Sequence, residues 1–179
     1  MSAPAIRRED ATTTVGMAIF LGAVAMLFAA LFFAYAVMRA QAPAWPPTGQ
    51  APLPAGTLGL NTLVLVAASV VLHAARRWDV ARARRGAWVA LALGAGFLAA
   101  QAAVWRSLVQ AGSGPASGIY GSVFFAISGF HALHVAGGLV ALALVAARGA
   151  GPRRLAACTL YWDFVLAVWL LFYAGACLR

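Results

Sequence analysis

The sequence predicts an all-α polytopic membrane protein, a bundle of five transmembrane helices. Three observations predict this class. The 179 residues are 64% hydrophobic and 9% charged, with a mean hydropathy of +0.87, whereas about a quarter of the residues in soluble domains are charged. Five apolar stretches are each near or above the ~20 residues that cross a hydrocarbon core of ~30 Å. The arginines, finally, gather on one side of these stretches.

Polar or helix-breaking segments separate the predicted spans, which cover residues 15–38, 57–75, 87–109, 119–147 and 156–178. Residues 1–10 are predicted to form a polar tail, and residues 11–179 the membrane domain. The first two spans are joined by residues 42–56, where five prolines exclude a helix. Glycine-rich turns at 112–118 and 149–152 separate the last three spans. No room remains for a water-soluble domain.

The arginines predict the orientation of the bundle. If the spans alternate in direction, one side holds ten of the thirteen cations: Arg7, Arg8, Arg76, Arg77, Arg82, Arg84, Arg85, Arg148, Arg153 and Arg154. The other side keeps Arg39, Arg106 and Arg179. Positively charged loops stay in the cytoplasm, so we expect a cytoplasmic N-terminus and a periplasmic C-terminus. The net charge of +9 is spread over these loops, which argues against nucleic acid as a partner.

Four arginines lie where a span meets the membrane surface: Arg39, Arg76, Arg77 and Arg106. Lipid phosphates attract arginine side chains at that depth, so these residues are candidate headgroup contacts.

Polar side chains inside the spans are the candidates for function, because each costs free energy unless it is paired. They are Asn61, Ser69, His73, Gln101, Ser122, Ser128, His131, His134, Thr159 and Asp163. Proton pumps and ion-coupled carriers usually need several intramembrane carboxylates, and this set contains one. A small transporter is therefore a weaker alternative.

The three histidines do not form a convincing haem site. His131 and His134 lie on one helix, too close to be opposite axial ligands of one iron. His73 and His134 differ in predicted depth by about 15 Å at ~1.5 Å per residue. We expect neutral histidines that hydrogen-bond across helices or to a lipid, with haem or another metal as the alternative. No catalytic residue and no metal ligand is predicted.

Asp163 is predicted about two turns inside the cytoplasmic edge. We expect it to be neutral or to pair with a loop arginine or with a polar side chain of the fourth span. Its neighbours Tyr161 and Trp162 suit the interfacial aromatic belt. Small residues such as Gly94, Gly129 and Gly137 predict close helix contacts.

The chain resembles subunit III of haem-copper terminal oxidases, the cytochrome c oxidase subunit III family, in its five-helix bacterial form. The motifs occur in the family's order: residues 16–21 (GMAIFL) and 25–35 (AMLFAALFFAY), residues 60–65 (LNTLVL) with Ser69 and His73, residues 96–101 (GFLAAQ) with Trp105, residues 130–138 (FHALHVAGG), and residues 161–165 (YWDFV) with Val168 and Trp169.

The resemblance implies a non-catalytic subunit of a respiratory complex in the bacterial inner membrane. That complex reduces oxygen to water with electrons from cytochrome c or quinol and couples this to proton translocation. Its subunits I and II are the implied partners and carry the haem and copper, while this chain binds none. The implied roles are to stabilise the catalytic subunit, to hold phospholipid in a helix cleft and to support proton uptake and oxygen access. The implied structural or lipid-cleft residues are Asn61, His73, Gln101, His131, His134, Trp162 and Asp163.

Four positions depart from the family's usual residues. Val24 and Val104 stand where the family usually has glutamate, Asp163 where it has histidine, and Leu166 where it has aspartate. The carboxylate chemistry of those positions therefore does not transfer to this chain. A related subunit of a nitric oxide reductase complex and a di-haem membrane anchor remain alternatives.

Overall fold

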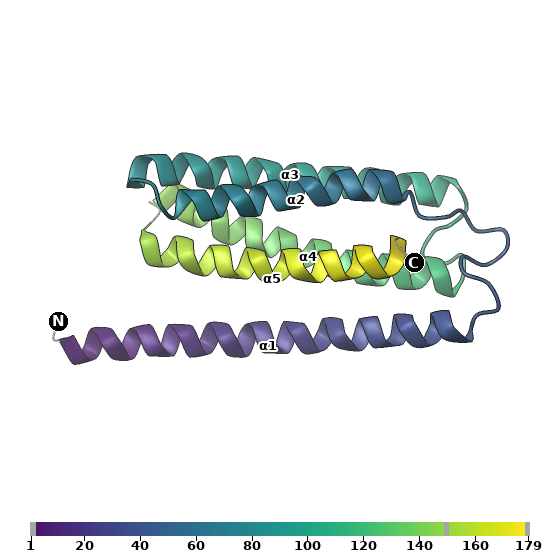
Figure 1. The fold of residues 1–179 in the computed structure, drawn as a ribbon, viewed down its shortest axis with the longest axis horizontal. Coiled ribbons are helices and arrows are strands. Elements are labelled where there is room, and N and C mark those ends of the chain that lie inside the picture. Colours follow the sequence, from purple (N-terminus) through teal and green to yellow (C-terminus); the bar gives the residue numbers. More distant parts are fainter. Residues whose placement is uncertain (1–2, 149–150, 178–179) are drawn as a thin grey trace.

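In the computed structural model, residues 3–148 and 151–177 are described, with side chains from residue 15 onward. These residues form five long helices (Figure 1): α1 (Ala3–Gln41), α2 (Ala55–Ala75), α3 (Val80–Gln110), α4 (Ile119–Arg148) and α5 (Pro152–Cys177). Each contains a stretch long and apolar enough to cross a membrane. The predicted all-α class with five spans is confirmed at this level. Arg179 lies outside the described residues.

The helices run side by side and alternate in direction (Figure 1). The start of α1, the α2–α3 turn, the end of α4 and the start of α5 lie at one end of the molecule. The α1–α2 loop, the α3–α4 loop and the end of α5 lie at the other. The arginines of the α2–α3 turn and of the adjoining ends of α4 and α5 therefore share one end, which we call the arginine-rich end.

Four of the helices begin before their predicted spans, α1 and α3 by the largest margins. The helix α1 starts at Ala3, so the predicted polar tail is largely helical backbone, and the apolar part begins at Val15. The helix α3 starts at Val80 because Asp79 caps it: the Asp79 carboxylate accepts a hydrogen bond from the Arg82 amide (3.0 Å). That hydrogen bond also lowers the pKa of Asp79.

The early start of α3 places Arg82, Arg84 and Arg85 on a helix rather than in a loop. One of them joins two helices: Arg84 Nε donates to the carbonyl oxygen of Ala146 (2.8 Å), in the last turn of α4. Carbonyls of a last turn lack intrahelical partners and carry negative partial charge, so an arginine stabilises them.

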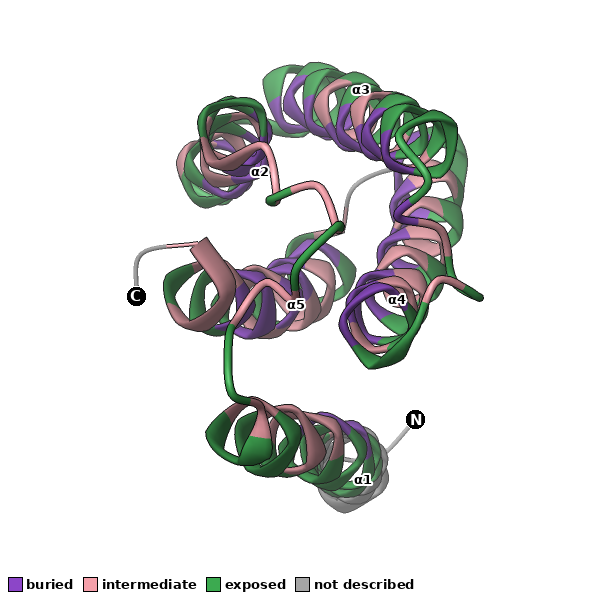
Figure 2. Cartoon of the chain, turned by 90° about the vertical axis from the view of Figure 1, so that its right-hand side faces the viewer, coloured by how far each residue is buried: buried purple, intermediate pink, exposed green. Residues whose placement is uncertain are grey.

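The helices α2, α3, α4 and α5 form the packed bundle, and α1 lies beside α4 and α5 (Figure 2). Among the described side chains of α1, those of Val24 and Phe28 are buried. They pack against Val168 of α5 in a small separate cluster. The rest of α1 mostly faces outward, so its attachment to the bundle depends on few contacts.

Helix α3 packs closely against α4 and α5 because Gly94 has no side chain. A Cβ atom at Gly94 of α3 would lie 2.5 Å from Trp162 Cη2 and 2.7 Å from Leu139 Cδ2. Gly138 of α4 meets Tyr161 in the same way, at 2.9 Å. The predicted role of Gly94 agrees with this packing. At Gly129 a Cβ would meet no described atom of this chain within 4 Å, so no close contact within the bundle uses this glycine.

Hydrogen bonds attach the proline-rich loop after α1 to the bundle, at the end opposite the arginine-rich end. The Ala51 amide donates to Ser113 Oγ (2.8 Å), and the Leu53 amide donates to the Tyr120 hydroxyl (3.1 Å). The Trp45 ring packs edge-on against Tyr120, with ring centroids 5.0 Å apart. Side chains and loop amides thus replace the helical hydrogen bonds that proline excludes.

Candidate functional site

A buried polar cluster joins α2, α3 and α5. Asn61 Nδ2 of α2 donates to the Phe97 carbonyl (3.3 Å) and to Gln101 Oε1 (3.4 Å), both on α3. Trp169 Nε1 of α5 donates to Thr62 Oγ1 of α2 (2.9 Å). The structure therefore brings the predicted residues Asn61 and Gln101 together. Sequence reasoning missed the Trp169–Thr62 bond, although a tryptophan inside a span needs a partner for its indole N–H.

His131 lies in the middle of the bundle with 1% of its surface exposed. Its ring packs on Trp169, with centroids 4.8 Å apart, and meets the edges of Phe97 (5.7 Å) and Phe28 (6.4 Å). Both ring nitrogens are buried without a hydrogen-bond partner among the described protein atoms. The expected interhelical hydrogen bond is thus replaced by aromatic contacts.

His134, one helical turn along α4, is partly exposed. Its Nδ1 lies 2.7 Å from the Phe130 carbonyl of its own helix, and Nδ1 must donate because a carbonyl can only accept. The Phe28 ring of α1 packs edge-on against the His134 ring at 5.3 Å. The two predicted histidines therefore share one partner, and through Phe28 they help to attach α1.

Trp162 faces the interior of the bundle, so its predicted place in an interfacial belt was wrong. Trp162 is buried against Gly94 and Gly138. Tyr161 donates its hydroxyl proton to the His134 carbonyl (2.9 Å). The missing side chains of the two glycines leave room for both rings inside the bundle, which a count of residues from the membrane edge does not reveal.

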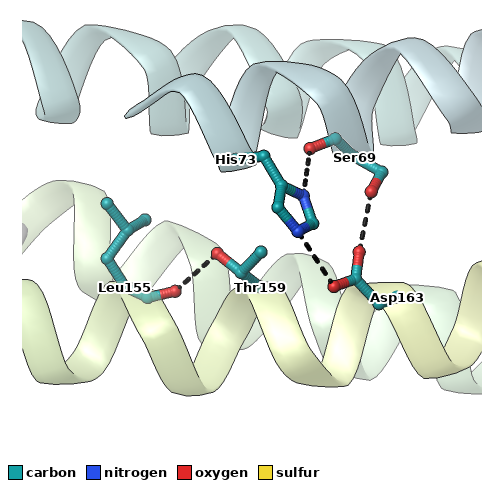
Figure 3. Close-up of polar contacts among 5 residues, drawn as sticks. All are labelled: Ser69, His73, Leu155, Thr159 and Asp163. Atoms are coloured by element: carbon teal, nitrogen blue, oxygen red, sulfur yellow. Dashed lines mark hydrogen bonds and ion pairs between the residues drawn. The ribbon is translucent and has the colours of Figure 1, made fainter. Parts of the chain in front are cut away.

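Asp163 of α5 is paired with α2 (Figure 3). Ser69 Oγ donates to Asp163 Oδ1 (2.7 Å), and His73 Nε2 lies 3.4 Å from Asp163 Oδ2. His73 Nδ1 lies 3.1 Å from the Ser69 carbonyl. The expected partner, an arginine or a polar residue of α4, was wrong because this face of α5 is turned toward α2.

The predicted headgroup arginines fall into different surroundings. Arg76 and Arg77 line an open groove of about 510 Å³ at the arginine-rich end, together with His73. Arg39 donates from Nη1 to the Gly175 carbonyl of α5 (2.6 Å) and so links the ends of α1 and α5. Arg106 is exposed on α3. Lipid contact at these residues stays a prediction.

Among the described side chains of residues 15–148 and 151–177, no group of three or more His, Cys, Asp or Glu residues is arranged to hold a metal ion. The polar side chains described above pair with one another or with aromatic rings and backbone carbonyls, an arrangement that can join helices and bind protons.

Comparison with known proteins decides the family. Residues 8–177 match the family model of cytochrome c oxidase subunit III. The probable cytochrome c oxidase subunit 3 of Nocardia farcinica is 38% identical over 178 residues, covering 90% of this chain and 85% of that protein. The chain belongs to the cytochrome c oxidase subunit III family. It is thus a multi-pass subunit of an oxidoreductase complex of the respiratory chain.

Other bacterial members of the subunit III family match over a similar extent. The cytochrome c oxidase subunit 3 of Synechocystis is 33% identical over 170 residues, covering 88% of this chain and 72% of that protein. The probable subunit 3 of Mycobacterium tuberculosis is 36% identical over 177 residues, covering 89% and 84%. The predicted resemblance to the five-helix bacterial form is therefore confirmed.

Two positions where the resemblance implies a glutamate hold buried valines in this fold. Val24 is buried between α1 and α5, beside Val168. Val104 is buried on α3, in the main core. Both valines fit their surroundings without a charged partner, so the packing of this subunit III does not need those carboxylates.

Proposed function

We propose that this chain is the non-catalytic subunit III of a bacterial cytochrome c oxidase, whose subunits I and II carry the haem and copper. The observation that carries the proposal is the match to the family model over residues 8–177, nearly the whole chain. In this role the chain packs against subunit I in the inner membrane and stabilises it. The exposed apolar faces of its helices supply the surface for that contact and for lipid.

The arginine distribution supports an orientation with the arginine-rich end in the cytoplasm. Arg76, Arg77, Arg148 and Arg154 all belong to that end. Basic segments near the ends of spans remain on the cytoplasmic side. The N-terminus then lies inside and the C-terminus in the periplasm.

The spaces beside α1 support the proposal that the subunit holds lipid. A groove of about 640 Å³ lies between α1 and α5 near their periplasmic ends, lined by Phe32, Leu171 and Phe172, with Arg39 at its rim. A second groove, of about 310 Å³, lies between α1, α4 and α5 beside Phe20 and Tyr161. Apolar walls suit acyl chains, and the guanidinium of Arg39 suits a phosphate.

Arg39→Gln is expected to reduce the phospholipid that remains on the subunit. The glutamine lacks the charge that attracts phosphate, while Arg39→Lys retains it. Native mass spectrometry of the detergent-washed complex measures the bound lipid. Arg39→Lys is the matched control, because it keeps the positive charge at the same position. Lipid retention in the Arg39→Gln variant equal to that of the wild type and of Arg39→Lys would refute the role of Arg39.

We further propose that the subunit supports proton uptake and oxygen access. His73 and Asp163 place titratable groups near the arginine-rich end, where protons enter from the cytoplasm in the proposed orientation. The apolar grooves beside α1 offer oxygen a non-polar environment near the partner subunit.

His131→Leu is expected to loosen the assembly of the oxidase or to speed its inactivation during turnover, while the haem spectrum per assembled complex stays unchanged. Leucine cannot reproduce the ring contacts of His131 with Trp169 and Phe97. The haem spectrum and the activity decay of the purified complex measure both effects. A haem signal lost from correctly assembled complex would show that His131 serves the cofactor directly.

Purification of the tagged chain from membranes in mild detergent tests the proposed function. We expect subunits I and II to co-purify and the preparation to oxidise cytochrome c. Co-purification with the subunits of a nitric oxide reductase, or with none, would overturn the assignment.

A further inference from the structure

The cluster of Ser69, His73 and Asp163 holds more acceptors than donors unless one extra proton is present (Figure 3). A neutral imidazole has one N–H, so His73 can donate at only one of two contacts: from Nδ1 to the Ser69 carbonyl (3.1 Å) or from Nε2 to Asp163 Oδ2 (3.4 Å). The other ring nitrogen then presents a lone pair to an acceptor.

The Ser69 hydroxyl, the other donor of the cluster, does not supply the missing hydrogen. Ser69 Oγ has one hydrogen and gives it to the other carboxylate oxygen, Asp163 Oδ1, at 2.7 Å. The contact between Nε2 and Oδ2 is attractive only with a proton between them.

We propose that Ser69, His73 and Asp163 form a binding site for one proton, and that this proton joins α2 to α5. In the loaded site a proton from water adds to the lone pair of His73 Nε2, and the resulting imidazolium donates to the Asp163 carboxylate. The site then contains a charge-assisted hydrogen bond, which is shorter and stronger than a neutral one. The proposal rests on the fold alone and does not depend on the oxidase assignment.

The site opens at the surface of the chain, where 51% of the His73 side chain and 38% of the Asp163 side chain are exposed. The groove beside His73 is also lined by Arg76 and Arg77, which directly follow the end of α2. Loss of the proton leaves two acceptors face to face. The contact between α2 and α5 is therefore weaker without this proton.

Several charged groups and histidines on the other helices have partners outside the cluster. At the start of α3, Asp79 and Arg82 pair with each other (3.4 Å). On α4, His131 contacts Trp169, and His134 bonds the Phe130 carbonyl. The described part of α1 contributes Arg39, which bonds Gly175 at the opposite end. On α5, the neighbouring Thr159 donates to its own helix at Leu155 (2.8 Å; Figure 3).

Nitrogen-15 NMR of the histidine-labelled full chain in lipid bilayers tests the proposal, because the chain has only three histidines. As the pH falls, we expect His73 to gain a second ring proton, on Nε2, while the Asp163 carboxylate carbon keeps its ionised shift. If Nε2 stays unprotonated while Asp163 stays ionised, or if Asp163 takes the proton first, the imidazolium site is contradicted.

Asp163→Asn separates the proton site from simple packing. The asparagine amide can donate to Nε2, so His73 satisfies both nitrogens without taking up a proton. We expect its second protonation to shift to lower pH or to disappear. Asp79→Asn is the matched control, since Asp79 also accepts hydrogen bonds but lies outside the cluster, and it should leave the His73 titration unchanged. Equal titration curves in all three chains would overturn the proposal. Should the Asp163→Asn chain not fold, the wild-type titration decides alone.

Discussion

Trp169→Ala is expected to destabilise the bundle by roughly 3 kcal/mol, the low end of the range for emptying a buried tryptophan site. Trp169 is 1% exposed, packs on the His131 ring, meets Phe97 edge to face and donates to Thr62. Lipid is as apolar as a protein core, so the loss comes from the cavity and the missing contacts rather than from transfer to water. Reversible unfolding in mixed micelles measures it.

The exposed neighbour Leu171 provides the control for Trp169. It lies two residues along α5 with 65% of its surface exposed, so Leu171→Ala should change the free energy of unfolding by less than about 0.5 kcal/mol. Trp169→Phe should recover much of the packing and lose the hydrogen bond to Thr62. Similarly small effects of Trp169→Ala and Leu171→Ala would show that the face of α5 that carries Trp169 is not buried in the bundle.

Gly94→Ala is expected to cost about 1–3 kcal/mol, the usual effect of an extra methyl group in a filled core. The new Cβ would lie 2.5 Å from Trp162, itself enclosed by α3 and α4. The same unfolding measurement applies. Gly96→Ala is the matched control two residues away, where a Cβ meets nothing within 4 Å. It should be neutral or slightly stabilising because alanine favours helix. The packing account requires Gly94→Ala to be the more harmful of the two.

The sequence was sufficient for the fold class, the number of spans and the family. Apolar length predicts a membrane helix directly, because the bilayer sets the length that each span needs. Motif order from residue 16 to Trp169 predicted the subunit III family, which the comparison confirmed. The orientation stays a prediction, since arginine distribution indicates it without showing it.

Side-chain partners were harder to predict than helices. Hydrophobicity hardly varies around these spans, so periodicity does not tell which way a residue points. The sequence therefore placed Trp162 at the interface and left Asp163 neutral or paired with a loop arginine or with α4, whereas rotation of α5 places Trp162 against Gly94 and Asp163 against His73. The contact of Asn61 with Gln101 was not predicted, although amides buried in a span must find each other or a backbone group. The capping of α3 by Asp79 could have been read from an aspartate directly before the helix.

Metal analysis of the separated subunits tests the central claim, that this chain supports a redox centre carried by its partners. The tagged chain is purified with its complex in mild detergent, then released from its partners, and iron and copper are measured per chain. We predict iron and copper on the partner chains and none bound stoichiometrically to this one. Stoichiometric iron or copper on the isolated, folded five-helix chain would contradict the account.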